Sequence, residues 1–188
     1  TDDGPLVMLV QGLAKGEKMD SVIRHATELG VAAFMPLTCE RSIVKLDAKK
    51  TRTRLDRWCS IAKSAAMQSG QPRIPEVLEP RSAKEAAVEL AEATAVLICW
   101  EEAPQTASLA QAIGRGLSEC SCPRGDARIA VVVGPEGGLT EREVGFFLDA
   151  NPRASLVSLG SSILRTETAG VVAPALTLYE LGKLGGTR

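Results

Sequence analysis

The clearest candidate for binding chemistry in this sequence is G-P-E-G-G-L, at residues 134–139, which combines three glycines, a proline and a carboxylate. Gly134, Gly137 and Gly138 permit positive φ and let a ligand approach the backbone closely. The spacing matches neither a dinucleotide-binding G-x-G-x-x-G loop nor a phosphate-binding loop that ends in Gly-Lys-Ser/Thr. A glycine-rich turn without a ligand is the simpler alternative, because glycines mark turns far more often than sites.

The residues around this loop narrow the kind of ligand that it could bind. The carboxylate of Glu136 would repel a phosphate. Thr140 and Glu143 have the spacing of a capping box, in which each side chain satisfies a backbone N–H group at the start of a helix. Because those donors are then partly occupied, the loop suits a flat, neutral or cationic ligand better than an anion.

Apolar segments with the length of buried strands alternate with helical patterns along the chain. We expect strands at residues 5–14, 32–38, 94–100, 127–134 and 154–160, and helices at residues 17–30, 48–69, 82–93 and 108–117, with a last helix from residue 166. Segment 70–80 contains three prolines and is expected to break the pattern. This alternation predicts an α/β fold with a mainly parallel sheet and helices on both faces.

Ligands of open parallel sheets bind outside the carboxyl ends of the strands. Three loops in this sequence follow such ends, namely C-W-E-E-A-P-Q at 99–105, the glycine-rich loop at 134–139, and G-S-S-I-L-R-T-E-T at 160–168. Trp100 and Glu101 in the first loop are weaker candidates, because that stretch carries no sharp motif. The sequence therefore predicts a binding site at this edge of the sheet.

Length and composition limit the class of protein. The 188 residues are 45% hydrophobic and 24% charged, as in ordinary globular proteins. No apolar run approaches the ~20 residues of a membrane helix, and the amino-terminal residues lack the basic start of a signal peptide, so we expect a cytoplasmic protein without a membrane partner. The five cysteines lack paired spacing and His25 is the only histidine, which argues against a disulfide framework and against a metal site.

Positive charge is concentrated in one segment of a nearly neutral chain. Residues 41–63 contain eight basic and two acidic residues, whereas the whole chain has a net charge of −1. Such a segment can bind a nucleic-acid backbone. A solvated helix face with no partner is the alternative, since runs of charge are common on exposed helices. Trp58 lies on the apolar stripe expected for this helix, together with Leu55, Cys59, Ala62, Ala65 and Ala66, so it is expected to pack in the core.

The sequence resembles a known family in four motifs that occur in the family's order. These are E-L-G-V-A-A-F-M-P-L-T-C-E-R-S, A-A-M-Q-S-G-Q-P-R-I-P-E-V, V-V-V-G-P-E-G-G-L-T-E-R-E-V and L-G-S-S-I-L-R-T-E-T-A-G. The family is that of the bacterial 16S ribosomal RNA uridine-N3 methyltransferases of the SPOUT class. The likeness extends from about residue 9 to residue 181, which is nearly the whole chain.

The resemblance implies an α/β fold with a deep trefoil knot at its carboxyl-terminal end, which composition alone could not indicate because knots are rare. It also implies S-adenosylmethionine as methyl donor, a homodimer, and methylation of N3 of a uridine in the 16S rRNA of the 30S subunit. Family members carry an amino-terminal RNA-binding barrel of the PUA type, which this sequence lacks. Residues 1–188 are therefore expected to be the SPOUT-type methyltransferase domain alone.

The resemblance also assigns roles to individual residues. The first wall of the donor pocket would contain Val133, Gly134, Glu136, Gly137, Gly138 and Leu139, and the second wall Leu159, Gly160, Ile163, Leu164, Arg165 and Thr166. Arg165 would be catalytic, because a guanidinium stays charged and can stabilise a developing uridine anion. Glu136 would orient the base or accept its proton. Arg41 and Gln68 stand in the family's motifs and would contact RNA or cap the active-site cleft. From the basic segment, rather than from the resemblance, Lys45 and Arg52 are also expected to contact RNA.

Several alternatives stay open at this point. Arg165 could form a salt bridge with Glu136 or Glu167 that only fixes the loop. A related SPOUT enzyme that acts on a ribose 2′-oxygen or on tRNA would share the glycine-rich motif, and a non-catalytic RNA-binding assembly factor would keep the basic segment but need no donor pocket. Two positions depart from the family pattern, because Ser161 replaces the usual proline and Pro174 lies inside the expected last helix, where it should cause a kink.

Overall fold

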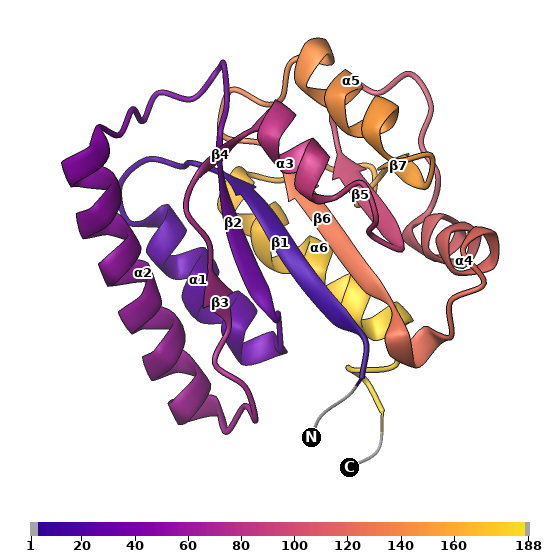
Figure 1. Cartoon of the computed structure of the whole chain (residues 1–188), viewed down its shortest axis with the longest axis horizontal. Coiled ribbons are helices and arrows are strands. Elements are labelled where there is room, and N and C mark those ends of the chain that lie inside the picture. Colours follow the sequence, from indigo (N-terminus) through magenta and orange to yellow (C-terminus); the bar gives the residue numbers. More distant parts are fainter. Residues whose placement is uncertain (1–3, 187–188) are drawn as a thin grey trace.

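A computed structural model describes residues 4–186 of the chain (Figure 1). The strands are β1 (Leu6–Gly12), β2 (Ala33–Thr38), β3 (Glu76–Val77), β4 (Arg81–Ser82), β5 (Ala95–Cys99), β6 (Arg128–Val133) and β7 (Ala154–Val157). The helices are α1 (Lys18–Leu29), α2 (Ala48–Ser69), α3 (Ala83–Glu89), α4 (Leu109–Glu119), α5 (Glu141–Ala150) and α6 (Thr166–Glu180), with a short 3₁₀ turn at Arg124–Asp126. The predicted alternation of strands and helices is confirmed.

All strands pair in parallel in one sheet with the order β3-β2-β1-β6-β5-β7, and β4 pairs with β2. In the centre of the sheet, Val10 of β1 lies beside Met35 of β2 on one side and Val132 of β6 on the other. The prediction of a mainly parallel sheet is therefore confirmed. The carboxyl ends of β5, β6 and β7 share one edge, as the site prediction requires.

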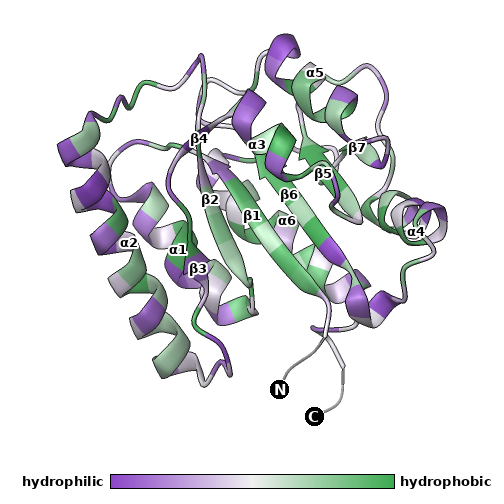
Figure 2. Cartoon of the chain, in the orientation of Figure 1, coloured by the Kyte–Doolittle hydropathy of each residue, from purple (hydrophilic) through white to green (hydrophobic). Residues whose placement is uncertain are grey.

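The sheet separates two hydrophobic cores. In β6, Ile129, Val131 and Val133 pack with residues of α1, α2, α4 and α6, whereas Ala130 and Val132 pack with residues of α3 and α5. Burial of both faces explains why the strands are continuously apolar in sequence rather than alternating. Figure 2 shows the central strands as the most hydrophobic part of the chain. Helices on both faces of the sheet were predicted and are confirmed.

Helix α2 has the bounds that the sequence predicted. The side chain of Asp47 caps its first turn by accepting a hydrogen bond from the Lys50 N–H group, and Gly70 ends it with a φ of 69°. Trp58 is fully buried against the core, as expected. Cys59 was placed on the same stripe and is exposed, so that part of the prediction was wrong. Its position, directly beside Trp58, turns it by about 100° toward solvent.

Helix α6 packs under the middle of the sheet, although it follows the edge strand β7. Gly170 allows this close approach, because a Cβ atom at that position would lie 2.5 Å from Gln11 Oε1 and 3.0 Å from a methyl group of Val22. Pro174 is buried inside the helix, as the sequence predicted. The chain thus returns from the edge of the sheet to β1 and α1, far from it in sequence.

Two details of the fold were not predicted. The proline-rich segment 70–80 was expected only to break the pattern, yet it leads into β3 and β4, which add two residues each to the edge of β2. Strands this short are set by the neighbouring strand rather than by their own composition. Helix α4 ends at Glu119 rather than residue 117. Within residues 4–186, no helix is long and apolar enough to cross a membrane.

Candidate functional site

The loops after β5 and β6 contact each other at the carboxyl edge of the sheet. The indole Nε1–H of Trp100, directly after β5, donates to the Leu139 carbonyl oxygen at 3.0 Å. Arg41, which follows β2, donates from Nη1 to Glu102 Oε1 at 3.0 Å and more loosely to the carbonyls of Gly137 and Leu139 at 3.4 Å. Arg41 therefore bridges the loops after β5 and β6.

The glycine-rich loop owes its shape to contacts with the protein. A Cβ atom on Gly137 would lie 2.8 Å from the carbonyl oxygen and 2.9 Å from the Cβ of Arg41. Gly138 has a φ of 74°, and its N–H donates to the Pro135 carbonyl at 2.8 Å. The predicted capping box at the start of α5 is confirmed, with Thr140 as the N-cap residue. The loop is thus a rigid turn held from several sides.

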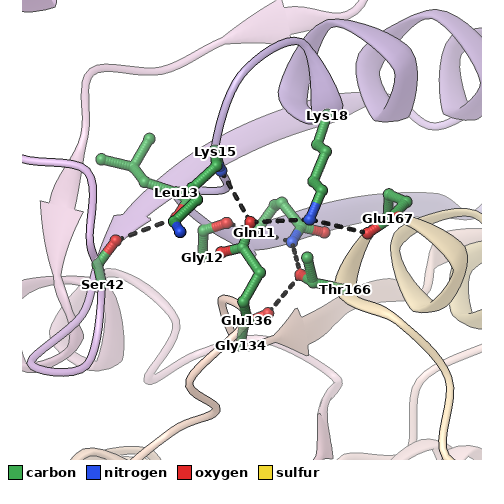
Figure 3. Close-up of polar contacts among 10 residues, drawn as sticks. All are labelled: Gln11, Gly12, Leu13, Lys15, Lys18, Ser42, Gly134, Glu136, Thr166 and Glu167. Carbon is green, nitrogen blue, oxygen red and sulfur yellow. Dashed lines mark hydrogen bonds and ion pairs between the residues drawn. The ribbon is translucent and has the colours of Figure 1, made fainter.

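A buried chain of hydrogen bonds links the end of β1 to the start of α6 (Figure 3). The Gln11 Nε2 group donates to Thr166 Oγ1 at 2.8 Å, and the Thr166 hydroxyl donates to the Gly134 carbonyl oxygen at 2.6 Å. Gln11 is 1% exposed, and its Oε1 atom has no hydrogen-bond partner among the described residues. The Thr166 hydroxyl therefore joins the two motif-bearing segments, 134–139 and 159–168, directly, and Gln11 ties the same hydroxyl to β1.

Lys18, near the start of α1, holds a carboxylate from each motif. Its Nζ atom lies 3.2 Å from Glu136 Oε1 and 3.8 Å from Glu167 Oε2 (Figure 3). Glu136 Oε1 also accepts a hydrogen bond from the Lys15 backbone N–H at 2.8 Å. One ammonium group and two carboxylates leave this cluster with a formal charge of −1 when all three are ionised, so the site is suited to a cation.

The pKa of Glu136 is set by opposing effects. Burial of its side chain favours the neutral form, but hydrogen bonds from the Lys15 N–H, from its own backbone and from Lys18, with the charge of Lys18, lower the pKa below the ordinary 4.5. The carboxylate is therefore ionised near neutral pH. Such a group can orient or attract a positive charge, but it is a weak acceptor of protons.

The loop between β7 and α6 has few contacts of its own. Gly160 has a φ of 126°, and its N–H and C=O groups both bond to the Ser158 hydroxyl. The backbone N–H groups of residues 161–164 donate no hydrogen bond to any residue in the described range. Ile163 is 82% exposed. This loop therefore presents unpaired amides and an apolar side chain to solvent.

Arg165 is exposed at the end of this loop, directly before α6. Its side chain forms no ion pair or hydrogen bond within residues 4–186, so the salt bridge with Glu136 or Glu167 considered from the sequence is not formed. Lys18 occupies that bridging position instead. The guanidinium of Arg165 is thus free to contact a bound molecule.

The residues predicted to contact RNA do not form one cluster. Arg41 lies at the carboxyl edge of the sheet where the loops after β5, β6 and β7 meet, which we call the loop edge. Lys45 lies before α2, and Arg52 and Gln68 lie on α2. All four are exposed to solvent. Arg52 and Gln68 are separated along the helix by about 24 Å, the rise of 16 helical residues. The structure thus places Arg41 beside the glycine-rich loop and the other three residues along a neighbouring helix.

Sequence reasoning missed Gln11, Lys15 and Lys18, which make the polar contacts between the motifs. A usable signal existed for Gln11, because a glutamine inside the apolar segment 5–14 must find a partner when buried. Lys18 resembled an ordinary exposed helix residue and gave no such signal. Among the described residues, no three His, Cys, Asp or Glu side chains are grouped to hold a metal ion.

An open parallel sheet with convergent loops at its carboxyl edge is typical of the α/β proteins whose ligands bind outside the carboxyl ends of the strands. The sequence profile of the RNA methyltransferase domain matches residues 3–178. The chain therefore belongs to the RNA methyltransferase domain family.

Individual relatives agree with this family. Ribosomal RNA small subunit methyltransferase E of Bacillus subtilis is 36% identical over 180 residues, which cover 96% of this chain and 68% of that protein. The protein of the same name from Mycobacterium tuberculosis is 35% identical over 173 residues, which cover 90% of this chain and 61% of that protein.

Solved structures of similar proteins include ligand complexes. A ribosomal RNA small subunit methyltransferase E from Neisseria gonorrhoeae bound to S-adenosyl methionine has a TM-score of 0.75, 32% identity, and coverage of 93% of this chain and 66% of that one. A Legionella pneumophila protein in complex with the same cofactor has a TM-score of 0.78, 29% identity, and coverage of 94% and 66%. Across these relatives and structures, the chain spans 61% to 68% of their length.

Proposed function

We propose that this chain is an S-adenosylmethionine-dependent methyltransferase that methylates N3 of a uridine in 16S rRNA of the small ribosomal subunit. The observation that carries the proposal is the contact between Thr166 and Gly134, which joins the two motif-bearing loops at the carboxyl edge of the sheet. Relatives named for small-subunit rRNA methylation and a relative bound to the donor support it. The finer assignment, uridine N3, rests on the four-motif resemblance.

The residues at this edge fit such a donor, whose sulfonium carries a positive charge and supplies an activated methyl group. Glu136 and Glu167 share one lysine, so the cluster keeps an excess negative charge for a cation. The unpaired N–H groups of residues 161–164 can hydrogen-bond the acceptor atoms of an adenine ring. In the proposed pocket, residues 133–139 form one wall and residues 159–166 the other.

The reaction would require uridine N3 to lose its proton to water. The donor would supply the methyl group, and its sulfonium would leave as a neutral thioether that keeps the electron pair of the broken carbon–sulfur bond. Positioning by the two walls would lower the barrier most, because aligned reactants avoid the entropy cost of meeting. Arg165, which has no partner among residues 4–186, would bind a uracil oxygen or a phosphate and stabilise the anion that develops. Glu136, ionised and held by Lys18, would orient the donor or the base rather than accept the proton.

The proposal includes a knotted chain and a homodimer. The segment after edge strand β7 must pass the ends of β5 and β6 to reach α6 beneath β1, a path that a trefoil knot would require. Exposed Ile163 in this segment and exposed Leu176 and Tyr179 on α6 would be covered by a second copy. Light scattering on the purified chain measures whether it is a dimer.

The test of the function is transfer of labelled methyl to small-subunit rRNA, followed by mass-spectrometric mapping of the modified atom. Label at uridine N3 supports the proposal. Label at a ribose 2′-oxygen, or on tRNA only, would assign the chain to another SPOUT reaction. RNA binding without donor binding or transfer would identify a non-catalytic factor.

A further inference from the structure

Ion pairing is unevenly distributed over the surface of the protein. Most basic side chains outside residues 45–63 form an ion pair or a hydrogen bond, as Lys18, Arg41 and Arg81 do. Within the described residues, six side chains between residues 45 and 63 form neither, and these are Lys45, Lys49, Lys50, Arg52, Arg54 and Lys63. Only Arg57 in this segment is neutralised, by buried Asp20 of α1 at 2.7 Å.

Three of these cations share the solvent side of α2. At 100° per residue, Lys49, Arg52 and Lys63 point within about 60° of one another and about 120–180° away from the buried Trp58. They extend over about 21 Å of the helix axis. We call Lys49, Arg52 and Lys63, with Lys45 in the preceding loop, the α2 stripe. Figure 2 shows hydrophilic residues along the length of this helix.

The first turn of α2 carries charges that do not favour its own stability. Asp47 caps the helix from the position before it. Within the first turn itself there are two lysines, Lys49 and Lys50, and no acidic residue. The helix dipole places positive charge at this end, so each cation there is unfavourable by a few tenths of a kcal/mol. A departure from a local rule without a structural gain is expected at functional positions. An anionic partner would reverse the sign of this effect.

The stripe begins on the side of the sheet that also carries the proposed reaction site. Because α2 follows the carboxyl end of β2, its first turns lie on the same edge of the sheet as the glycine-rich loop, and the helix runs back from there (Figure 1). Arg41, at the start of the connection to α2, contacts the carbonyls of Gly137 and Leu139. Arg41 itself pairs with Glu102, so among the described residues the unpaired positive charge begins at Lys45, in the connection that leads to α2.

We propose that the α2 stripe binds the phosphate backbone of the RNA substrate and guides the strand to the site at the loop edge. The inference rests on the proposed function for the identity of the partner. A nucleic-acid backbone carries regularly repeated negative charge, which complements a line of cations that extends over about 21 Å. Phosphate contacts of this kind position the nucleic acid without reading its sequence. Asp56 and Ser60 lie on the same side of the helix, so the middle of the stripe carries no cation. Two separate groups of phosphate contacts are therefore expected, one at Lys49 and Arg52 and one at Lys63.

The test compares two lysines that differ only in place. Lys49→Gln on α2 and Lys84→Gln on α3, which covers the opposite face of the sheet, each remove one exposed, unpaired cation. Affinity for a transcript of Bacillus subtilis small-subunit rRNA is measured over a range of salt concentrations. We expect Lys49→Gln to weaken binding about fivefold at 0.1 M salt and to reduce the slope of log affinity against log salt by ~0.7, and Lys84→Gln to leave both unchanged.

A triple variant enlarges the effect. Lys49→Gln/Arg52→Gln/Lys63→Gln should weaken binding on the order of 100-fold and reduce the slope by ~2, while Lys49→Arg/Lys63→Arg should keep both. Calorimetry with S-adenosylmethionine should give wild-type affinity for every variant, because no substitution touches the loop edge. Intact donor affinity with lost RNA binding supports the stripe.

Other outcomes would overturn the proposal that the α2 stripe binds RNA. Equal weakening by Lys84→Gln would show that only net charge matters, and wild-type RNA affinity in the triple variant would place the RNA elsewhere. Binding of the wild-type chain to phosphatidylserine vesicles that is lost in the triple variant, with RNA binding unchanged, would assign the stripe to a membrane surface. Absence of methyl transfer by a wild-type chain that binds RNA through the stripe would contradict the proposed function and leave this inference standing.

Discussion

The two loops that meet at the site are held in opposite ways. The loop 134–139 is fixed by Arg41, by the Trp100 indole, by the Thr166 hydroxyl and by hydrogen bonds from Lys15 and Lys18. The loop 158–165 is held internally by the Ser158 hydroxyl, while residues 161–164 leave their amides unpaired. Contacts within the protein thus fix the first loop, whereas the second has few such contacts among the described residues.

This difference has a physical consequence for binding. A preformed loop loses little conformational entropy when a ligand binds. A loop with unpaired backbone groups loses more, because binding is what orders it. Substitutions in the first loop should therefore alter stability and donor binding together. Substitutions in the second loop should alter ligand-dependent properties and leave the unfolding free energy nearly unchanged.

The largest effect is expected at Gly137. Gly137→Val places a branched side chain where even a Cβ atom would lie 2.8 Å from the Arg41 carbonyl oxygen, so Arg41 and the loop must separate. We expect a loss of about 2–3 kcal/mol in the free energy of unfolding, which is typical of overpacking, and no measurable donor binding. Denaturant unfolding and calorimetry with S-adenosylmethionine measure both.

The matched control is Gly160→Ala in the second loop. A Cβ atom there meets nothing within 4 Å, and only the φ of 126° resists it. Wild-type donor affinity in a folded Gly137→Val protein would refute the pocket assignment. A larger loss of stability at Gly160 than at Gly137 would reverse the contrast between the loops.

Arg165 tests the ligand-dependent loop. Because its guanidinium has no partner in the described structure, Arg165→Lys should leave unfolding unchanged and keep most of the donor affinity. Turnover should fall on the order of 100-fold, since an ammonium cannot reproduce the planar fork that stabilises an anion. Single-turnover methyl transfer and donor calorimetry separate the two effects. Equal losses in affinity and turnover would instead indicate that Arg165 braces the loop.

Thr166 tests the link between the loops. Thr166→Val removes the hydroxyl that bonds to Gly134 and leaves the buried Gln11 amide with only its longer bond to the Gly12 carbonyl, so we expect a cost of about 1–3 kcal/mol and weaker donor binding. Thr177→Val is the control, since Thr177 is also buried on α6 but bonds only within the helix. Donor affinity reduced equally by both would show that α6 packing, rather than the link, is responsible.

Lys18 offers the smallest effect, visible in the dependence of stability on pH. The lowered pKa of Glu136 contributes stability above pH 4.5 that is lost as the pH falls through the folded-state pKa. Lys18→Met removes part of this lowering, so it should cost about 0.5–1 kcal/mol near neutral pH and less in acid. Urea unfolding from pH 3 to pH 7 measures this, with Lys18→Arg expected to restore the wild-type profile. A cost independent of pH would mean that Lys18 acts by packing.

Local patterns in the sequence predicted the fold well. Apolar periodicity located β1, β2, β5, β6, β7 and α2, and the capping box located the start of α5, because these signals are local in the sequence. β3 and β4 escaped prediction because two-residue strands depend on the neighbouring β2 for their pairing. The exposed side of Cys59 was missed because the apolar stripe was drawn too wide.

The site was predictable in place but not in its internal contacts. Glycine spacing and parallel topology placed the loops at one edge, yet the sequence alone did not show that Lys18 pairs with Glu136 and Glu167. Nor did it show Gln11 against Thr166. Those pairs join residues more than 100 positions apart, so they depend on tertiary packing that no local pattern encodes.

The hydrogen bond between Gln11 and Thr166 also constrains when the protein can fold. The two residues lie 155 positions apart, so at roughly 5–20 residues per second the first of them waits about 8–30 seconds on the ribosome for its partner. During that time β1 and α1 lack α6, and the apolar surface that α6 will cover is exposed to water and to other nascent chains. The loop edge can therefore form only after Thr166 has been synthesised, long after β1 and α1 have left the ribosome.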